Sequence, residues 1–250
     1  MLRKLLLAAA VTAILPAAAA TIPAYVKAAV SDSARPEADT KRDPERKPAA
    51  MLVFAGIKPG MKVVDIIPGS GYFTRLFAKA VGPKGFVYDY FPAELDAAVK
   101  KHGGDPNNQG KPFAAYGNVG AIHGTMEKFV TPEKVDLIWT SQNYHDLHDK
   151  FFGPADMMTV DKAIYATLKP GGIFIVLDHA AAAGSGTRDT ETLHRIDEAA
   201  VKSEVEAVGF KLVGESNVLR NPKDDHTLKV FDPAIRGRTD QFILKFRKPR

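Results

Sequence analysis

Short apolar runs alternate with amphipathic stretches along most of the chain. Apolar runs of about four to eight residues, bounded by turn residues, are typical of strands that a parallel sheet buries on both faces. Such runs predict strands at residues 63–67, 86–91, 121–124, 135–140 and 173–177. Two more strands are predicted at residues 210–219 and 241–246.

The stretches between these runs carry apolar residues at helical spacing. They predict helices at residues 49–55, 72–81, 92–102, 154–168 and 190–208. A chain in which strands and helices alternate in this way folds as an α/β protein whose helices cover both faces of the sheet. The sequence therefore predicts a Rossmann-like, doubly wound sheet over residues 48–250.

A glycine turn follows the first predicted strand. Gly69 and Gly71 let the chain turn tightly and let a ligand approach the bare backbone. The helix that starts there presents unpaired N–H groups and partial positive charge at the carboxyl edge of the sheet. The turn therefore suits a ligand that carries an anionic or carboxylate group.

A second stretch with candidate chemistry, residues 141–149, follows the fourth predicted strand. A loop in that position faces the crevice at the carboxyl edge of the sheet. Asn143 and Tyr144 are therefore expected to reach a cofactor and a substrate. His145 is a candidate base near neutral pH, and Asp146 is a candidate partner that orients it.

The same stretch allows a metal site as the alternative. His145, Asp146, His148 and Asp149 offer ligand types that suit zinc or iron. Two histidines three residues apart in a loop are a weak indication of metal binding. His148 and Asp149 are therefore interpreted as exposed residues that cap the next helix, and no metal is predicted.

The first strand and its turn resemble motif I of the class I S-adenosylmethionine-dependent methyltransferases, which is usually hydrophobic-D-hydrophobic-G-x-G-x-G. Asp65, Gly69 and Gly71 fall on fixed positions of that motif, whereas Ile67 stands at its first glycine. The L-K-P-G-G turn at residues 168–172 is a second point of resemblance. The N-Y-H-D-L-H and N-P-K-D-D-H-T stretches are similar to a subgroup of predicted exported methyltransferases.

This resemblance implies seven strands, mostly parallel with the last one antiparallel, and S-adenosyl-L-methionine as the cofactor. The glycine turn and the helix N-terminus would hold the methionine part, and Asp65 would orient the turn or meet the amino group. Asp89 or Phe91 would meet the ribose, and Thr125 lies where many of these enzymes hold the adenine. The full set of implied cofactor-binding residues is Asp65, Pro68, Gly69, Ser70, Gly71, Tyr72, Asp89, Phe91, Thr125 and Asn143.

The implied reaction is in-line methyl transfer to a small-molecule acceptor, in which the protein contributes mainly proximity and alignment. The expected catalytic residues are Tyr144, His145 and Asp146. The alternative is a non-catalytic, exported ligand-binding protein on the same scaffold. Export favours this alternative, because the cofactor is made in the cytoplasm.

Composition narrows the classes of function. Hydrophobic residues make up 45% of the 250 residues, which allows one substantial core. The formal charge is +5, and losing two basic residues with residues 1–20 leaves 32 − 29 = +3. That charge is too mild to indicate a nucleic-acid partner. The absence of cysteine excludes a disulfide framework, a thiolate metal site and a cysteine nucleophile.

Residues 1–20 have the pattern of a secretory signal peptide. Arg3 and Lys4 precede an apolar run at residues 5–15, and small residues at 17–20 form a cleavage region. The apolar run is short for a bilayer span. The sequence therefore predicts an exported, periplasmic protein with no stable membrane insertion after cleavage.

Residues 21–47 are polar and contain prolines at positions 23, 36 and 44. They are predicted to form a linker and a short helical lead-in before the domain at 48–250. Residues 41–47 are interpreted as a solvated charged face. The alternative for this segment is that Arg46 helps to close the cofactor cleft.

Signal cleavage near Ala20 can be tested directly. Mass spectrometry of the protein isolated from its native envelope should show a mature chain that starts close to residue 21, because the small residues before it suit signal peptidase. An intact Met1 on soluble cytoplasmic protein would contradict the prediction.

Overall fold

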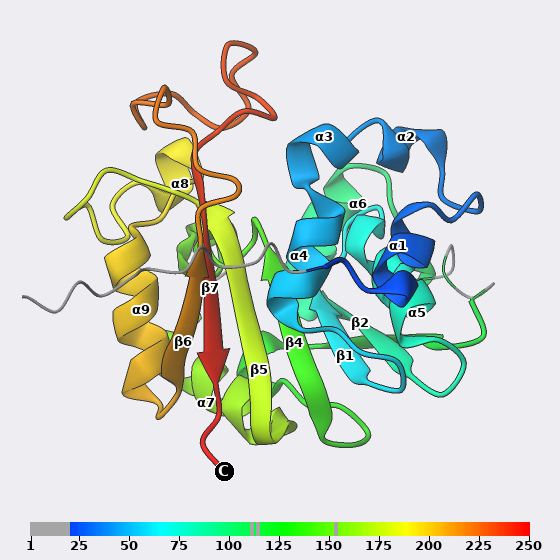
Figure 1. The fold of residues 1–250 in the computed structure, drawn as a ribbon. Coiled ribbons are helices and arrows are strands. Elements are labelled where there is room, and N and C mark those ends of the chain that lie inside the picture. Colours follow the sequence, from blue (N-terminus) through cyan, green and yellow to red (C-terminus); the bar gives the residue numbers. More distant parts are fainter. Residues whose placement is uncertain (1–20, 111–112, 114–115, 153–154) are drawn as a thin grey trace, which may run out of the picture.

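The computed structural model describes residues 21–110, 113, 116–152 and 155–250. Its centre is a seven-stranded sheet with the strand order β3-β2-β1-β4-β5-β7-β6 (Figure 1). The strands are β1 (Lys62–Ile66), β2 (Phe86–Pro92), β3 (Val119–Gly124), β4 (Val135–Ser141), β5 (Leu168–His179), β6 (Lys211–Ser216) and β7 (Gln241–Arg247). All seven predicted strands are confirmed; six shift little at their ends, whereas β5 begins at Leu168 and includes the predicted turn at residues 168–172.

The pairing of the strands confirms the predicted sheet. β1 pairs in parallel with β2 and β4, β3 pairs in parallel with β2, and β5 pairs in parallel with β4. β7 is antiparallel to both β5 and β6. The strand order reverses between β1 and β4, and ligands of open α/β sheets bind at such a switch point, outside the carboxyl ends of the strands.

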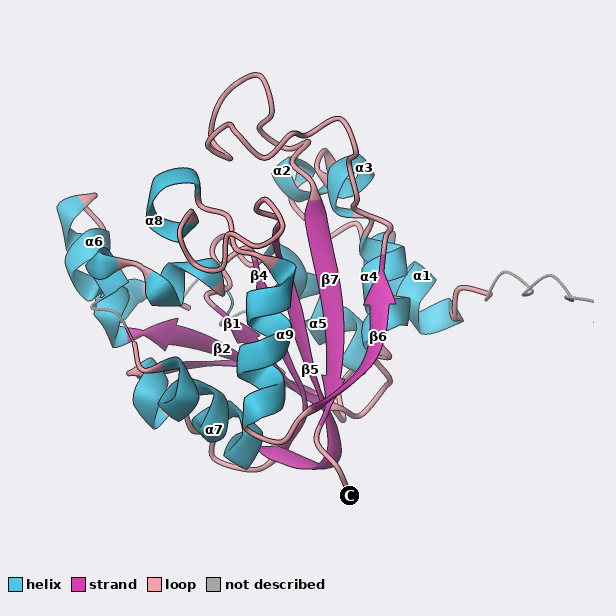
Figure 2. Ribbon diagram, turned by 90° about the vertical axis from the view of Figure 1, so that its left-hand side faces the viewer, coloured by secondary structure: helices cyan, strands magenta, loops and turns pink. Residues whose placement is uncertain are grey.

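Helices cover both faces of the sheet. They are α1 (Ala24–Val30), α2 (Glu37–Thr40), α3 (Asp43–Arg46), α4 (Pro48–Ala55), α5 (Tyr72–Val81), α6 (Asp96–Lys101), α7 (Met157–Thr167), α8 (Thr190–Leu193) and α9 (Glu198–Ala207). Short 3-10 turns are η1 (Ala93–Leu95), η2 (Pro106–Asn108), η4 (Met126–Lys128), η5 (His145–His148) and η6 (Lys150–Phe152). One buried cluster joins α1, α4 and α5 to one face, and a second joins α7 and α9 to the other (Figure 2).

The structure differs from the sequence prediction at residues 21–47, which are folded against the domain rather than forming a linker. Val26 and Ala29 of α1 are fully buried in the cluster with α5. The prolines that indicated a linker begin helices instead: Pro23 and Pro36 precede α1 and α2, and Pro44 lies in the first turn of α3. Proline is common at helix starts because its fixed φ suits the first turn and its missing N–H is not needed there.

The predicted helix at residues 190–208 is divided into α8 and α9. His194 ends α8 in the left-handed conformation, with φ of 54°. Asp197 then caps α9 by accepting the backbone N–H of Ala199. An amphipathic pattern continues through this break, which is why the sequence indicates one helix where the structure has two.

The segment between β6 and β7 is anchored by a buried ion pair. The guanidinium of Arg195 is fully buried and donates to both carboxylate oxygens of Asp224 at 2.9 and 3.0 Å. It also donates to the carbonyls of Ala180 and Leu228. These bonds tie the segment to the carboxyl end of β5 and to the loop after α8.

Within the described residues, no helix has both the length and the apolar character that a bilayer span requires. The predicted signal peptide at residues 1–20 lies outside the described part of the chain. It therefore stays a prediction.

Removing Asp224 should destabilise the protein strongly. Asp224→Ala leaves the Arg195 charge buried without its partner, a change that typically costs about 3–5 kcal/mol. Urea unfolding followed by circular dichroism measures the loss. Asp225→Asn, a change at the exposed neighbouring residue, is the control and should leave the unfolding midpoint almost unchanged. Equal midpoints for Asp224→Ala and the wild type would show that the pair anchors nothing.

Candidate functional site

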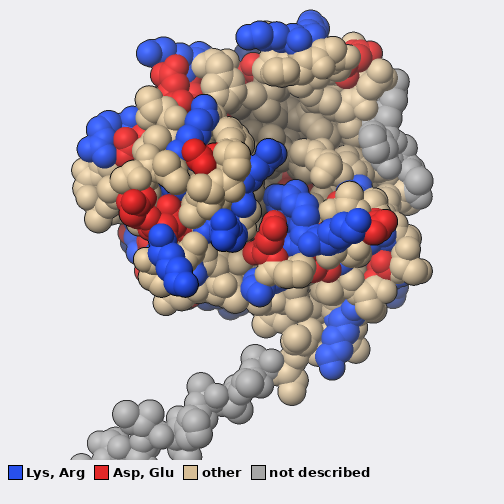
Figure 3. Space-filling model, turned by 90° about the horizontal axis from the view of Figure 1, so that it is seen from above, with Lys and Arg blue, Asp and Glu red and all other residues tan. Residues whose placement is uncertain are grey.

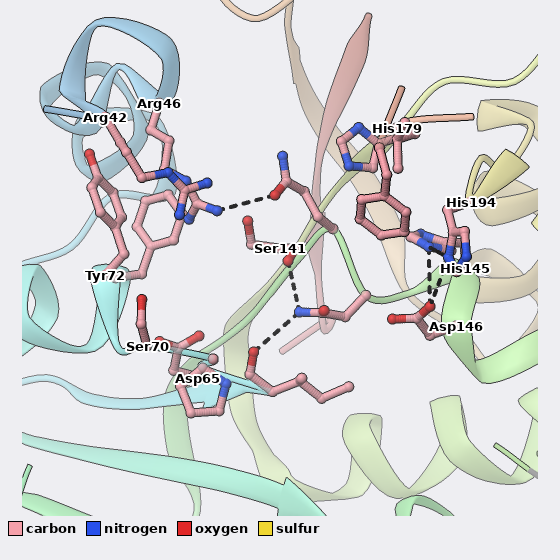
Figure 4. A pocket seen from close by; sticks show the side chains of 18 residues that line it. Arg42, Arg46, Asp65, Ser70, Tyr72, Ser141, His145, Asp146, His179 and His194 are labelled. Carbon is pink, nitrogen blue, oxygen red and sulfur yellow. Dashed lines mark hydrogen bonds and ion pairs between the residues drawn. The ribbon is translucent and has the colours of Figure 1, made fainter. Parts of the chain in front are cut away.

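A cavity of about 320 Å³ opens at the carboxyl ends of β1, β4 and β5. Figure 3 views this edge from above, and the surface is hollowed near the middle of the view. Three groups of residues line the cavity: the turn after β1 with the start of α5, the loop after β4, and side chains from α3, β5 and the segments after α8 and β6. The residues used below are Arg42, Arg46, Asp65, Ile67, Pro68, Gly69, Ser70, Tyr72, Gln142, Asn143, His145, Asp146, His179, His194, Val230 and Phe231 (Figure 4).

The turn after β1 has the sharp left-handed course that the glycines predict. Gly69 has φ of 57° and would meet no other atom within 4 Å if it carried a Cβ, so its backbone faces open space. Ile67 has φ of 53°, a strained conformation for a β-branched residue. The Nδ2 of Asn143 donates to the carbonyl of Ile67 at 3.3 Å, which ties the turn to the loop after β4.

Gly71 is the N-cap of α5 and does not line the cavity. A Cβ at this position would lie 2.0 Å from Cε1 of Phe113. The Phe113 ring thus occupies the place where a side chain at position 71 would lie, so only glycine fits here. The prediction that Gly71 meets the ligand is not borne out by its position, and its role is to admit Phe113.

Asp65 and Asp89 lie side by side on β1 and β2, and both are buried. The Oγ1 of Thr74 lies 2.9 Å from Asp65 and 2.8 Å from Asp89. A threonine hydroxyl has one proton to donate, so the second contact is a hydrogen bond only when that carboxyl is protonated. Burial raises the pKa of both carboxyls, and the charge of Asp65 raises the pKa of Asp89 further.

Only Asp65 of this pair borders the cavity. The cavity lining does not include Asp89, Phe91 or Thr125, which the resemblance assigns to the ribose and the adenine. Asp89 lies beneath α5, and its position contradicts the expectation of a direct ribose contact. The carbonyl of Thr125 accepts the hydroxyl of Tyr90 at 2.8 Å. Apart from Gly71, the residues predicted for the methionine part therefore lie together along the cavity, whereas those predicted for the nucleoside do not.

His145 begins η5 in the loop after β4 and is 2% exposed. Its Nδ1 lies 2.8 Å from Oδ1 of Asp178 at the end of β5, and its backbone N–H donates to Oδ2. Its Nε2 lies 3.2 Å from Oδ1 of Asp146. Burial favours the neutral ring, but the two carboxylates outweigh burial and raise the pKa of His145 to about 10.

With both carboxylates in contact the doubly protonated ring is favoured, which argues against the prediction that His145 acts as a base near neutral pH. A ring that already carries both protons cannot accept another one. The predicted pairing with Asp146 is confirmed by the 3.2 Å contact. The residue that orients the ring most firmly is Asp178 near the carboxyl end of β5, which is not among the predicted site residues.

Tyr144 does not reach the cavity, which corrects its prediction as a catalytic residue. Its side chain is 1% exposed and packs inward, towards α7 and α9. Its hydroxyl lies 2.9 Å from Asp161 and 3.1 Å from Glu204. Tyr144 therefore anchors the loop to the core, while its neighbours Asn143 and His145 face the cavity.

Arg46 forms a basic wall of the cavity, as the alternative for this segment holds, whereas most other residues of 41–47 are exposed as the solvated face predicts. Its guanidinium donates to Oε1 of Gln142 at 3.2 Å and lies 4.8 Å from the centre of the Tyr72 ring. Burial lowers its pKa to about 10, which keeps it charged at neutral pH. The lead-in helix α3 thus closes one side of the cavity and adds a cation to it.

Two histidines that are not among the predicted site residues border the cavity. Nδ1 of His179 forms a hydrogen bond with the hydroxyl of Thr239 at 2.8 Å. Burial lowers the pKa of His179 to about 3. His194 has Glu198 four residues further on, a spacing that would make them a surface pair on one continuous helix. Instead its Nδ1 lies 3.3 Å from Nε2 of His145 and 3.6 Å from Oδ1 of Asp146.

Of the four residues in the alternative metal site, only His145 and Asp146 belong to the cluster of possible metal ligands. His145 and Asp146 stay together, but Nε2 of His148 lies 3.3 Å from Glu204, away from them. Asp149 is 1% exposed, so its interpretation as an exposed residue is wrong, and it lies outside the cluster. No sequence pattern connects His194 to the loop after β4, because only the break between α8 and α9 aims its ring there.

Comparisons with known proteins give partial matches. No protein-family model matches the chain. The ubiquinone/menaquinone biosynthesis C-methyltransferase UbiE of Pseudomonas paraeruginosa (strain DSM 24068 / PA7) is 31% identical over 137 residues, which are 54% of this chain and 48% of the relative. UbiE of Hydrogenovibrio crunogenus (strain DSM 25203 / XCL-2) is 34% identical over 131 residues, 51% of this chain and 45% of the relative. The chain thus spans about half the length of the curated relatives it matches.

Solved structures match over more of the chain. A SAM dependent methyltransferase from Aquifex aeolicus has a TM-score of 0.55 at 18% identity, covering 85% of this chain and 98% of that chain. N-methyltransferase NodS from Bradyrhizobium japonicum WM9 has a TM-score of 0.57 at 15% identity, covering 85% and 99%. The [4+2]-cyclase SpnF has a TM-score of 0.55 at 16% identity, covering 85% and 81%. The chain has the class I S-adenosylmethionine-dependent methyltransferase fold.

The buried carboxyl pair predicts a specific pH dependence of stability. Between the ordinary aspartate pKa of about 3.9 and the raised folded values, the folded protein holds more protons than the unfolded chain. The free energy of unfolding should therefore fall as the pH rises through this window. Asp89→Asn removes one of the two groups and should make that fall shallower by up to about 1.4 kcal/mol per pH unit.

Urea unfolding of the wild type and Asp89→Asn at several pH values between about 5 and 8 measures the two slopes. The asparagine keeps the size of the side chain, so packing changes little. Identical slopes would mean that the two carboxyls titrate independently of burial and of each other.

Proposed function

We propose that the protein is an S-adenosylmethionine-dependent methyltransferase that acts on a small-molecule acceptor. The observation that carries this proposal is the cavity above β1 and β4, which joins the motif I turn to the loop after β4. The similarity to methyltransferases in sequence and in fold supports it. When bound, the cofactor supplies an electrophilic methyl group, and the protein's task is to hold and align it.

The cavity wall suits the methionine part of the cofactor. The N-terminus of α5 presents backbone N–H groups beside Pro68, Gly69 and Ser70, and these favour a carboxylate. Arg46 adds a positive charge in the same cavity, and Asp65 offers a carboxyl to an amino group. Asn143 holds the turn through its bond to Ile67 and thereby keeps the pocket wall in place.

The acceptor would approach from the side of the loop after β4. His145, Asp146 and His194 stand there, opposite the glycine turn in the lining of the cavity (Figure 4). The quinone biosynthesis named for the UbiE relatives is not carried over to this chain, because the matched part is about half of each relative. The comparisons give no support to the alternative of a non-catalytic binding protein.

We also propose that the protein is exported and acts outside the cytoplasm. The charged start, the apolar run and the small residues before position 21 support this proposal. The similarity of the N-Y-H-D-L-H stretch to predicted exported methyltransferases points the same way. Export requires that the cofactor reach the same compartment as the enzyme.

Gly69→Ala tests the assignment of the cavity. The added methyl group would project into open space at the turn, where the backbone should meet the cofactor. It should weaken binding of S-adenosylmethionine and S-adenosylhomocysteine by roughly tenfold or more in calorimetric titration. Gly60→Ala is the matched control, because Gly60 also has a positive φ, of 85°, and open space, but lies outside the cavity lining.

Both variants should lose a similar amount of stability, since each forces alanine into a left-handed conformation. Only Gly69→Ala should lose affinity. Equal affinities of the two variants would place the cofactor elsewhere. A wild type that binds neither ligand would overturn the proposed function itself.

A further inference from the structure

We propose that His145, Asp146 and His194 form a zinc site on the acceptor side of the cavity. Their Nε2, Oδ1 and Nδ1 atoms all lie within 4.8 Å of one another. Two histidine nitrogens and one carboxylate oxygen are the ligand set of many catalytic metal sites. In the part of the chain that the structure describes, this is the one group of three or more possible metal-ligating residues so arranged.

The spacing of the three atoms fits tetrahedral zinc. Zinc bonds of about 2.0–2.1 Å place any two ligands of a tetrahedron roughly 3.3–3.4 Å apart, whereas an octahedral site with such bonds needs about 2.8–3.0 Å. The separations are 3.2 Å for His145 to Asp146, 3.3 Å for His145 to His194 and 3.6 Å for His194 to Asp146. The three atoms therefore describe one face of a tetrahedron.

The ring of His145 is held as a metal-ligating histidine usually is. The Asp178 carboxylate accepts hydrogen bonds from the backbone N–H groups of His145 and His179. One of its oxygens also lies 2.8 Å from Nδ1 of His145. The Nδ1–H therefore donates to Asp178, and a zinc ion would displace the proton of Nε2, whose lone pair then points at the cluster. A carboxylate that fixes the outer nitrogen of a ligating histidine is a recurring feature of zinc sites.

His194 is brought to the cluster by a strained backbone. Its φ of 54° places a non-glycine residue in the left-handed region, which costs on the order of 1–3 kcal/mol. The ring is also packed against Phe231, with 4.9 Å between ring centres. Strain of this kind persists where the surrounding structure enforces it, and here it aims Nδ1 at His145 and Asp146 (Figure 4).

The fourth ligand of the ion would come from the cavity, because all three protein ligands border it. A zinc ion with three protein ligands binds water or a substrate atom and lowers the pKa of the group it binds. This role rests on the proposed function: the ion would bind the oxygen or sulfur atom of the acceptor and hold it facing the cofactor side of the same cavity.

Zinc binding can be measured without any cofactor or acceptor. Protein treated with a chelator and then dialysed is titrated with zinc by calorimetry, and the metal content is counted by mass spectrometry. The wild type should bind one zinc ion per chain. His194→Asn removes the ligand nitrogen but suits the left-handed backbone. Losing a residue that only hydrogen-bonds a metal ligand typically weakens metal binding roughly 10–100-fold. His194→Asn removes a ligand itself, so it should weaken zinc binding by at least that factor.

His226→Asn is the matched control. His226 also has a positive φ, of 63°, and a carboxylate partner, Asp240 at 3.1 Å, but it lies outside the cluster. It should bind zinc as the wild type does. Asp146→Asn serves as a second variant of the site, and circular dichroism checks that each protein is folded.

Two outcomes would overturn the zinc site: a folded wild type that binds no zinc, or a folded His194→Asn and Asp146→Asn that bind it as tightly as His226→Asn. Neither outcome would contradict the proposed methyltransferase function, because cofactor binding is measured separately on metal-free protein.

Discussion

The carboxyl of Asp178 holds the loop after β4 against the end of β5. It is completely buried, accepts the backbone N–H groups of His145 and His179, and bonds the ring of His145. One side chain thus fixes both the course of the loop and the direction of its central histidine. The wall of the cavity opposite the glycine turn depends on this contact.

The glycine turn supplies the other wall, and it keeps its course although the first glycine of the motif is replaced. Ile67 takes the left-handed conformation that glycine adopts without strain, and its carbonyl is held by Asn143. Its side chain packs against the main hydrophobic cluster, which offsets part of the backbone strain. Beneath the turn, Asp65, Asp89 and Thr74 join β1, β2 and α5 through one hydroxyl. The turn is therefore positioned by buried polar contacts as well as by sheet pairing.

The sequence was sufficient to predict where the strands lie, because apolar runs between turn residues indicate strands that are buried on both faces of the sheet. It was also sufficient for the turn at Gly69 and for the place of His145 at the carboxyl edge. It failed where a side chain's direction depends on tertiary packing: Tyr144, between two residues that face the cavity, turns into the core. Gly71 resembles a ligand contact in sequence but accommodates Phe113. His194 enters the site only because an apparently continuous helix breaks at a left-handed residue.

A crystal structure of the mature protein with S-adenosylhomocysteine tests the central claim most directly, because that claim is a position in space. The account predicts the amino-acid part of the ligand against residues 68–70 at the N-terminus of α5. It predicts that the sulfur atom faces the loop that carries Asn143 and His145. A ligand bound at any other surface, with this cavity filled only by solvent, would contradict the account.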